Sequence, residues 1–150
     1  MGTVKVTTED YPLYEKKSEL IKTLTGKSVD EITVENVLAG EMTPEDCRIS
    51  PETLEYQAQI AHDCGSFQIA ANFRRAAELT KIPDNRILEI YNCMRPYNST
   101  EQEILDIAEE LESKYGAKLN AMLLRETAEV YKERNILKTG EGTNEIYSGH

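Results

Sequence analysis

The stretch RILEIYNCMRPY, residues Arg86–Tyr97, predicts a helix that is too apolar for the surface of a soluble protein. At about 100° per residue, one stripe of this helix consists of Ile87, Ile90, Tyr91 and Met94. Leu88 and Cys93 widen the apolar side to roughly 200°, whereas a surface helix usually needs little more than about 100°. The sequence therefore raises the question of what covers the extra apolar side.

Two helices are expected before this stretch. Ser50 is placed to cap the first, Pro51 occupies its first helical position, and Gly65 stops it. Ser66 caps the second, which ends before Pro83. The residues of the second helix that we expect to face inward are Ile69, Phe73, Ala76 and Ala77.

Two more helices are expected after it. Ser99 and Thr100 each precede a Gln or Glu by three residues, which predicts a helix start, and Gly116 closes that helix. Its apolar residues are Ile104, Ala108, Leu111 and Tyr115. The last helix repeats their spacing with Ala117, Ala121, Leu124, Ala128 and Tyr131. A second line of apolar residues on this helix consists of Leu123, Val130 and Leu137.

The first third of the chain is poor in large apolar residues and reads as irregular. Ser28 and Glu31 form a capping box that predicts one short helix, and Gly40 ends it. We therefore expect an all-α protein in which an irregular N-terminal arm precedes about five helices packed in a small bundle. Its expected parts are an extended arm with one short helix (1–49), a helical domain (50–138) and a mobile tail (139–150), within a single structural domain.

Composition limits the possible partners. The 150 residues carry a net charge of −10, which argues against nucleic acid and anionic membranes, since both need clustered positive charge. The chain has no apolar run long enough to span a membrane and no apolar segment typical of a secretory signal at its start. Cys47, Cys64 and Cys93 are odd in number and widely spaced, which favours reduced thiols in a cytoplasm.

The sequence shows no pattern typical of an active site. His62 and Cys64 are two residues apart, which places them on different faces of a helix, and His150 ends the chain. The only glycine cluster, GEG at 140–142, is not a phosphate-binding loop. The glutamates that we considered for acid–base chemistry are Glu109, Glu110 and Glu112, which we assign to a solvated face.

Arg74 and Arg75 are the remaining candidates, because two adjacent cations could bind an anion. In so acidic a chain we expect them to pair with Glu residues instead. We therefore predict no catalytic, cofactor-binding or metal-binding residue. Together with the wide apolar side of Arg86–Tyr97, this favours a helical protein whose exposed surfaces are completed by partner chains.

Several blocks of the sequence resemble one known family, the small (gamma) subunits of coenzyme B12-dependent glycerol and diol dehydratases. The resemblance covers about Asp10 to Lys138, in order and with little gap. The blocks are DYPL (10–13), ITVENVLAGEMTPEDCRIS (32–50), ETLEYQAQIA (52–61), NFRRAAELTKIPDNRILEIYNCMRPYNST (72–100) and LRETAEVYKER (124–134). The block from Asn72 to Thr100 is the most specific of them.

This resemblance implies the function. Enzymes of this family convert glycerol to 3-hydroxypropionaldehyde, or 1,2-propanediol to propionaldehyde, with loss of water and with adenosylcobalamin as the source of a radical. The resemblance implies a dimer of heterotrimers in which large (alpha) and medium (beta) subunits hold substrate and cofactor. The mostly helical small subunit lies on the large one, so no catalytic residue carries over to this chain. It also gives the apolar side of Arg86–Tyr97 a partner: part of it packs on neighbouring helices, and part meets another chain or the arm.

Two features depart from the family pattern. Only nine residues precede DYPL, whereas some diol-dehydratase small subunits carry a longer N-terminal extension linked to placement in a protein-shelled microcompartment. We therefore expect the shorter, glycerol-dehydratase-like form in the bacterial cytoplasm. The final residues, GEGTNEIYSGH (140–150), do not match the family.

Two other classes of protein stay open. A free-standing helical adaptor or regulatory protein would be a stable monomer or homodimer whose third helix is covered by the chain itself. An independent enzyme would need a convergent polar cluster, which the sequence does not display.

Overall fold

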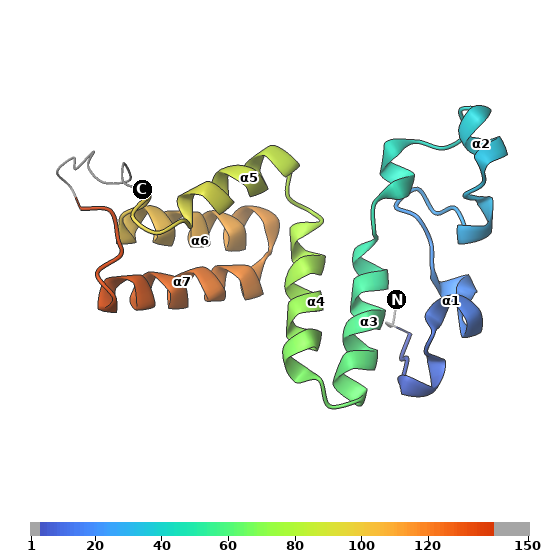
Figure 1. The fold of residues 1–150 in the computed structure, drawn as a ribbon, viewed down its shortest axis with the longest axis horizontal. Helices are drawn as coiled ribbons and strands as arrows, with labels where there is room; N and C mark the ends of the chain where they lie inside the picture. The colour runs from blue at the N-terminus through green and yellow to red at the C-terminus, as the bar shows by residue number, and fades with distance from the viewer. Residues whose placement is uncertain (1–3, 140–150) are drawn as a thin grey trace, which may run out of the picture. The chain divides into compact units, whose positions relative to one another are not determined.

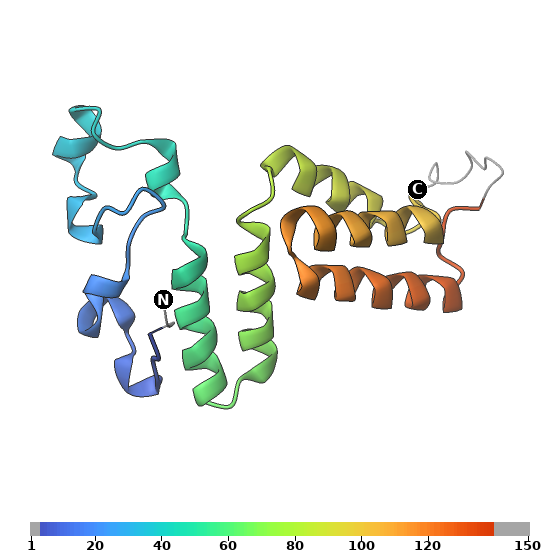
Figure 2. The same ribbon diagram turned by 180° about the vertical axis from the view of Figure 1, so that it is seen from behind.

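A computed structural model of the chain describes residues 4–139, and the regular structure within those residues is helical (Figures 1 and 2). Its α-helices are α1 (Leu13–Lys16), α2 (Val34–Leu38), α3 (Pro51–Asp63), α4 (Phe67–Leu79), α5 (Asp84–Cys93), α6 (Glu101–Tyr115) and α7 (Lys118–Glu133). Short 3-10 helices are η1 (Thr8–Asp10), η2 (Ser18–Leu20), η3 (Val29–Glu31) and η4 (Pro44–Cys47). The expected all-α class is confirmed, and the five helices expected after Ser50 correspond to α3 through α7.

The chain forms two compact units that divide after Lys81. The first contains α1 to α4, and the second contains α5 to α7. The boundary that the sequence led us to place between residues 49 and 50 falls inside the first unit. Of the predicted tail, 139–150, only Thr139 belongs to the described residues.

In the first unit, α3 and α4 form a helical hairpin (Figures 1 and 2). The Ser50 hydroxyl caps α3 by accepting the backbone N–H of Thr53 at 3.2 Å, as its sequence predicts. Gly65 adopts a φ of +81° in the turn, a conformation that costs glycine little. The two helices meet through small buried side chains, which are Ala58, Ala61 and Ala70, with Phe73 packed against them.

The N-terminal arm packs on α3. Val6 and Leu13 are buried against Tyr56 and Ile60, and this cluster is the arm's contribution to the core. The backbone N–H of Val6 also donates to Gln59 Oε1 at 2.9 Å. Val6 and Leu13 therefore fasten the start of the arm along one face of α3.

The single helix expected between Ser28 and Gly40 is split in the structure into η3 and α2. The Ser28–Glu31 capping box is present, but it starts only the 3-10 turn. Thr33 then adopts an extended conformation, and its hydroxyl accepts the N–H of Asn36 to cap a new helix. A second N-cap inside the segment thus interrupts the helix, and Gly40, with a φ of +75°, ends it. The arm also contains a further short helix, α1, which the sequence did not lead us to expect.

A buried carboxylate holds the segment around residue 25 against η4. Asp46 has a side chain fully shielded from solvent, and it accepts hydrogen bonds from Thr25, Lys27 and Thr43. The Lys27 Nζ to Asp46 Oδ2 distance is 2.9 Å. These bonds, of which the Thr25 hydroxyl makes the largest contribution, hold the pKa of Asp46 well below its usual range. The acid joins the loop around residue 25 to η4.

The second unit is built on the α6–α7 hairpin. Thr100 and Glu103 form the expected capping box, and Gly116, with a φ of +66°, ends α6 as the sequence predicts. The buried residues of the hairpin are Ile104, Ile107, Ala108, Leu111, Ala117, Asn120, Ala121, Leu124 and Ala128. The alanines among them are small enough to let the two helices pack closely.

Candidate partner-binding surfaces

The histidine and cysteine at the end of α3 make separate contacts. The His62 ring lies edge-on to the Phe67 ring, with 4.9 Å between the ring centroids. The Cys64 sulfur lies 3.2 Å from the carbonyl oxygen of Ala61. Both residues are exposed, and neither contact gives the thiol an activating base. The geometry favours a structural interpretation of this pair.

The glutamates of α6 join helices. Glu110 pairs with Arg86 of α5, and Glu112 lies 2.7 Å from Arg125 of α7. Glu109 also lies 3.6 Å from Arg125, but its side chain is 73% exposed, which agrees with the predicted solvated face. The side chains of Glu110 and Glu112 are 26% and 38% exposed, so both are only partly solvated, because they contact arginines of other helices in the same unit.

The adjacent arginines of α4 have partners inside the first unit. Arg74 makes a two-point contact with Glu55 of α3, at 3.2 Å from Nε to Oε2 and 3.3 Å from Nη2 to Oε1. The expected pairing with glutamate is confirmed for this residue. The Arg75 guanidinium donates to the side-chain oxygen of Asn72 one turn earlier.

Within residues 4–139, no group of three or more His, Cys, Asp or Glu side chains is arranged to hold a metal ion. Nor does any helix of that range have the length and apolar character needed to cross a membrane. Cys47 and Cys64 are exposed free thiols and Cys93 is a half-buried one. His150 and the GEG sequence lie outside the described residues. That the chain contributes no catalytic, cofactor-binding or metal-binding residue stays a prediction.

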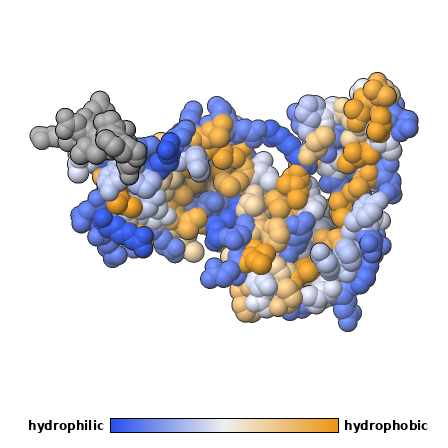
Figure 3. All heavy atoms as spheres, in the orientation of Figure 1, coloured by the Kyte–Doolittle hydropathy of each residue, from blue (hydrophilic) through white to orange (hydrophobic). Residues whose placement is uncertain are grey.

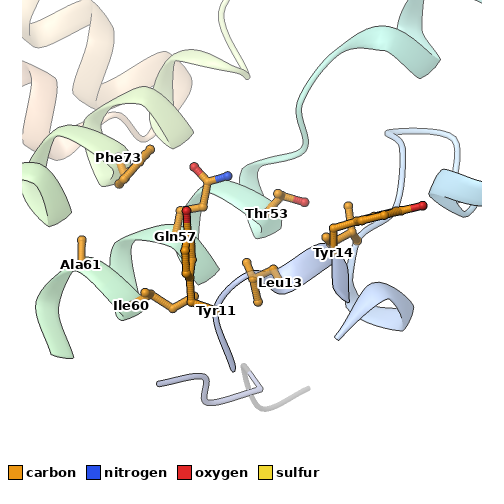
Figure 4. Close-up of a pocket in the computed structure, with 9 residues that line it drawn as sticks. Tyr11, Leu13, Tyr14, Thr53, Gln57, Ile60, Ala61 and Phe73 are labelled. Atoms are coloured by element: carbon orange, nitrogen blue, oxygen red, sulfur yellow. The ribbon is translucent and has the colours of Figure 1, made fainter. Parts of the chain in front are cut away.

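A groove of about 460 Å³ lies in the first unit between the arm and the α3–α4 hairpin (Figure 4). Side chains from α1, α3 and α4 converge on it, and its lining residues are Tyr11, Leu13, Tyr14, Ile21, Thr53, Gln57, Ile60, Ala61 and Phe73. These are apolar, aromatic or neutral polar residues. None of them is a carboxylate, a histidine, a thiol or a cation, so the groove suits packing better than acid–base chemistry. Sequence patterns alone did not reveal it, because its walls lie far apart in the chain.

The apolar side of α5 is only partly covered by its own unit. No residue of α5 is buried. Ile87 and Ile90 are half-buried, whereas Leu88 is 62% and Tyr91 is 69% exposed. On α7, the second apolar line is also accessible, since Leu123 is 40% exposed. The second unit thus presents large apolar side chains to solvent on two helices.

The most exposed large apolar side chains belong to the first unit. Around α2, Val34 is 70% and Leu38 is 83% exposed. Figure 3 shows apolar residues gathered where α2 lies in Figure 1, with hydrophilic residues beside them. Clustered exposed apolar side chains of this kind mark contact sites for other molecules. Such surfaces are the strongest functional feature of the described residues.

Comparison with known proteins gives these surfaces a context. A family described as "Dehydratase small subunit" matches residues 6–138. A "Propanediol dehydratase small subunit" of Citrobacter freundii is 54% identical over 136 residues, which cover 91% of this chain and 78% of that protein. A "Propanediol dehydratase small subunit" of Salmonella typhimurium (strain LT2) is 55% identical over 129 residues, which cover 86% of this chain and 75% of that protein.

Proposed function

This chain belongs to the dehydratase small-subunit family, and we propose that it is the non-catalytic small subunit of an adenosylcobalamin-dependent diol dehydratase. The holoenzyme converts a vicinal diol to an aldehyde and water: 1,2-propanediol to propionaldehyde, or glycerol to 3-hydroxypropionaldehyde. Its partners are a large and a medium subunit, in a dimer of heterotrimers in the bacterial cytoplasm. The role of this chain is to stabilise the large catalytic subunit.

The match over residues 6–138 carries this proposal, since it spans both compact units of the chain. Both relatives have names that specify propanediol, which favours 1,2-propanediol as the first substrate to test. Glycerol is the second substrate to test, because it also contains a vicinal diol.

The exposed apolar side chains support a subunit role. Obligate interfaces resemble a domain core cut in half, and their residues are apolar and solvent-exposed when the chain is viewed alone. Leu38, Leu88 and Tyr91 fit that description, with exposed fractions between 62% and 83%. A free-standing adaptor whose third helix is covered by its own chain would leave Leu88 and Tyr91 shielded instead.

The apolar groove of the first unit is a poor fit for adenosylcobalamin. The apolar groove of about 460 Å³ lies within the size range of drug-sized ligands, and a corrin ring with its nucleotide and adenosyl groups is larger than this. When bound in the holoenzyme, the cofactor would supply the radical chemistry. We therefore assign its binding to the other subunits.

The test is co-purification from the native cells. A tagged copy of this chain is isolated under mild conditions, and the eluate is assayed for aldehyde from 1,2-propanediol and from glycerol, with and without adenosylcobalamin. We expect two larger chains and cofactor-dependent aldehyde. A preparation of the larger chains without this one is the matched control and is expected to be less soluble or less active. A lone, stable, inactive chain would reject the proposal in favour of the adaptor.

A further inference from the structure

The segment around α2 exposes a patch of four branched apolar side chains. Ile32 is 43%, Val34 70%, Val37 55% and Leu38 83% exposed. No residue of α2 is buried, so this helix adds nothing to the core of its own unit. We call Ile32, Val34, Val37 and Leu38 the α2 patch.

Local hydrogen bonds hold the α2 patch in a fixed shape. An isolated helix of five residues is too short to be stable in water. Here Thr33 caps it, and Asn36 Nδ2 donates to the carbonyl oxygen of Glu31 at 2.7 Å. Lys27 also donates to the carbonyl oxygen of Glu41 just after the helix, and the same ammonium pairs with buried Asp46. A pre-formed surface of this kind loses little conformational entropy when it binds.

The chain segment that carries the patch is acidic. Residues 28–47 contain no Lys or Arg. The exposed acids of that segment are Asp30, Glu31, Glu35, Glu41 and Glu45. An apolar centre with a charged rim is the usual anatomy of a protein–protein contact, and a rim of one sign calls for the opposite sign on the partner.

We propose that the α2 patch docks into an apolar pocket of the large dehydratase subunit whose rim carries Lys and Arg. This rests on the proposed function, which supplies the partner, while the charge and shape of the patch supply the chemistry of its pocket. Two other occupants fit less well. A symmetric dimer through the patch would bring the acidic segments of two copies together, which like charges disfavour. An anionic membrane would repel the same rim.

The first experiment compares Leu38→Asp with Leu38→Met in the assembled complex. Leu38 is 83% exposed, so we expect both full-length variants to keep the helix content and melting temperature of the unaltered chain. Leu38→Asp should weaken association with the large subunit by roughly tenfold or more, because it places a charge in an apolar contact. Leu38→Met should bind as the unaltered chain does, since its volume and apolar character are kept.

The second experiment identifies the partner directly. A photoreactive amino acid at position 38 should cross-link to the large subunit, at a peptide that contains apolar residues flanked by Lys or Arg. The same group at Glu109, on the solvated face of α6, is the positional control. Glu35→Lys should slow association, with an effect that shrinks as salt is raised from about 50 mM to about 500 mM.

The outcomes separate the two proposals. If the unaltered chain assembles and Leu38→Asp assembles equally well, the α2 patch is not a docking surface, although the subunit role holds. If Leu38→Asp changes only self-association, or the cross-link joins two copies of this chain, the occupant is a second copy and the inference fails. If the unaltered chain does not bind the large subunit at all, both proposals fail.

Discussion

The guanidinium of Arg86 lies against the carboxylate of Glu110, with 3.2 Å between Nε and Oε1, and this contact fastens α5 to α6. Arg86 also pairs with Glu89 on its own helix at 2.7 Å. The hydrogen bonds from Arg86 lower the pKa of Glu110 and raise that of the guanidinium. Since α5 buries no residue, the ion pair is one of the contacts that fix the orientation of the helix.

Arg86→Gln should therefore loosen α5. Both charged groups are about a quarter exposed, so we expect a loss of only about 1 kcal/mol in the free energy of unfolding, near the upper end for a surface pair. Chemical denaturation followed by circular dichroism measures this loss. Arg95→Gln, at an exposed residue just after α5, is the matched control and should have little effect. Equal stability of all three proteins would show that Arg86 is not an anchor.

Asp46 should make the first unit sensitive to acid. Its folded-state pKa is lowered below the unfolded value of about 3.9, so its contribution to stability is complete above that value and is lost as pH falls below it. Asp46→Asn should be less stable at pH 7 and should show a flatter acid dependence below about pH 4. Thermal unfolding of both proteins from pH 7 to pH 2 measures this. Glu45→Gln, at the exposed neighbouring residue, should retain the acid dependence of the unaltered chain.

Gly116 should resist substitution for conformational reasons alone. Its φ is +66°, and a Cβ added there would meet no atom within 4 Å. Gly116→Ala should therefore destabilise the protein by roughly 1–2 kcal/mol through backbone strain. Gly116→Asn should cost less, because Asn tolerates the left-handed region better. The denaturation midpoints of the unaltered chain and the two variants measure these losses in stability. A Gly116→Ala variant as stable as the unaltered chain would contradict the strain argument.

Helix ends were predictable because capping is local chemistry. The Ser50 cap, the Gly65 turn, the Thr100 capping box and the Gly116 stop all use residues within a few positions of the helix terminus. At residues 28–40 the prediction of one helix was wrong. The capping box at Ser28 was recognised, but the second N-cap at Thr33 was not. Two caps five residues apart cannot serve one helix.

Helix faces were less predictable where small residues make the contact. Ile69 was expected to face inward, yet it is 51% exposed, whereas Ala70 is 1% exposed. The reason is that α3 and α4 meet through alanines, so the burial of α4 follows its small side chains and not its largest apolar ones. A hydrophobic pattern gives the most weight to large residues, so here it predicts that Ile69 faces inward and overlooks Ala70.

The ion pairs and the groove required the fold. Arg86 and Glu110 are 24 residues apart, and Arg74 and Glu55 are 19 apart. Nothing in the periodicity of a single helix says which opposite charge will face it from another. The wide apolar side of α5, by contrast, was visible in the sequence, and the structure shows Leu88 and Tyr91 of that side exposed.

His62 tests the prediction that this chain has no active site. His62→Ala should leave aldehyde production by the assembled dehydratase nearly unchanged, because the ring contacts only Phe67 among the aromatic residues described. The measurement is the rate of aldehyde formation at saturating diol and cofactor. Phe67→Leu is the companion variant for any packing effect. A large loss with His62→Ala alone would mean that a functional residue had been overlooked.

Tyr91 tests whether the extra apolar side of α5 meets another dehydratase chain. The side chain is 69% exposed in the chain alone, so Tyr91→Asp should leave its folding unchanged. In the complex the same charge would be buried without a partner, and we expect association with the large subunit to weaken by about 100-fold or more. Sedimentation of the co-expressed subunits and the yield of aldehyde report the loss. Tyr91→Phe keeps the ring and should assemble normally. Full assembly and activity of Tyr91→Asp would mean that this side of α5 stays in solvent.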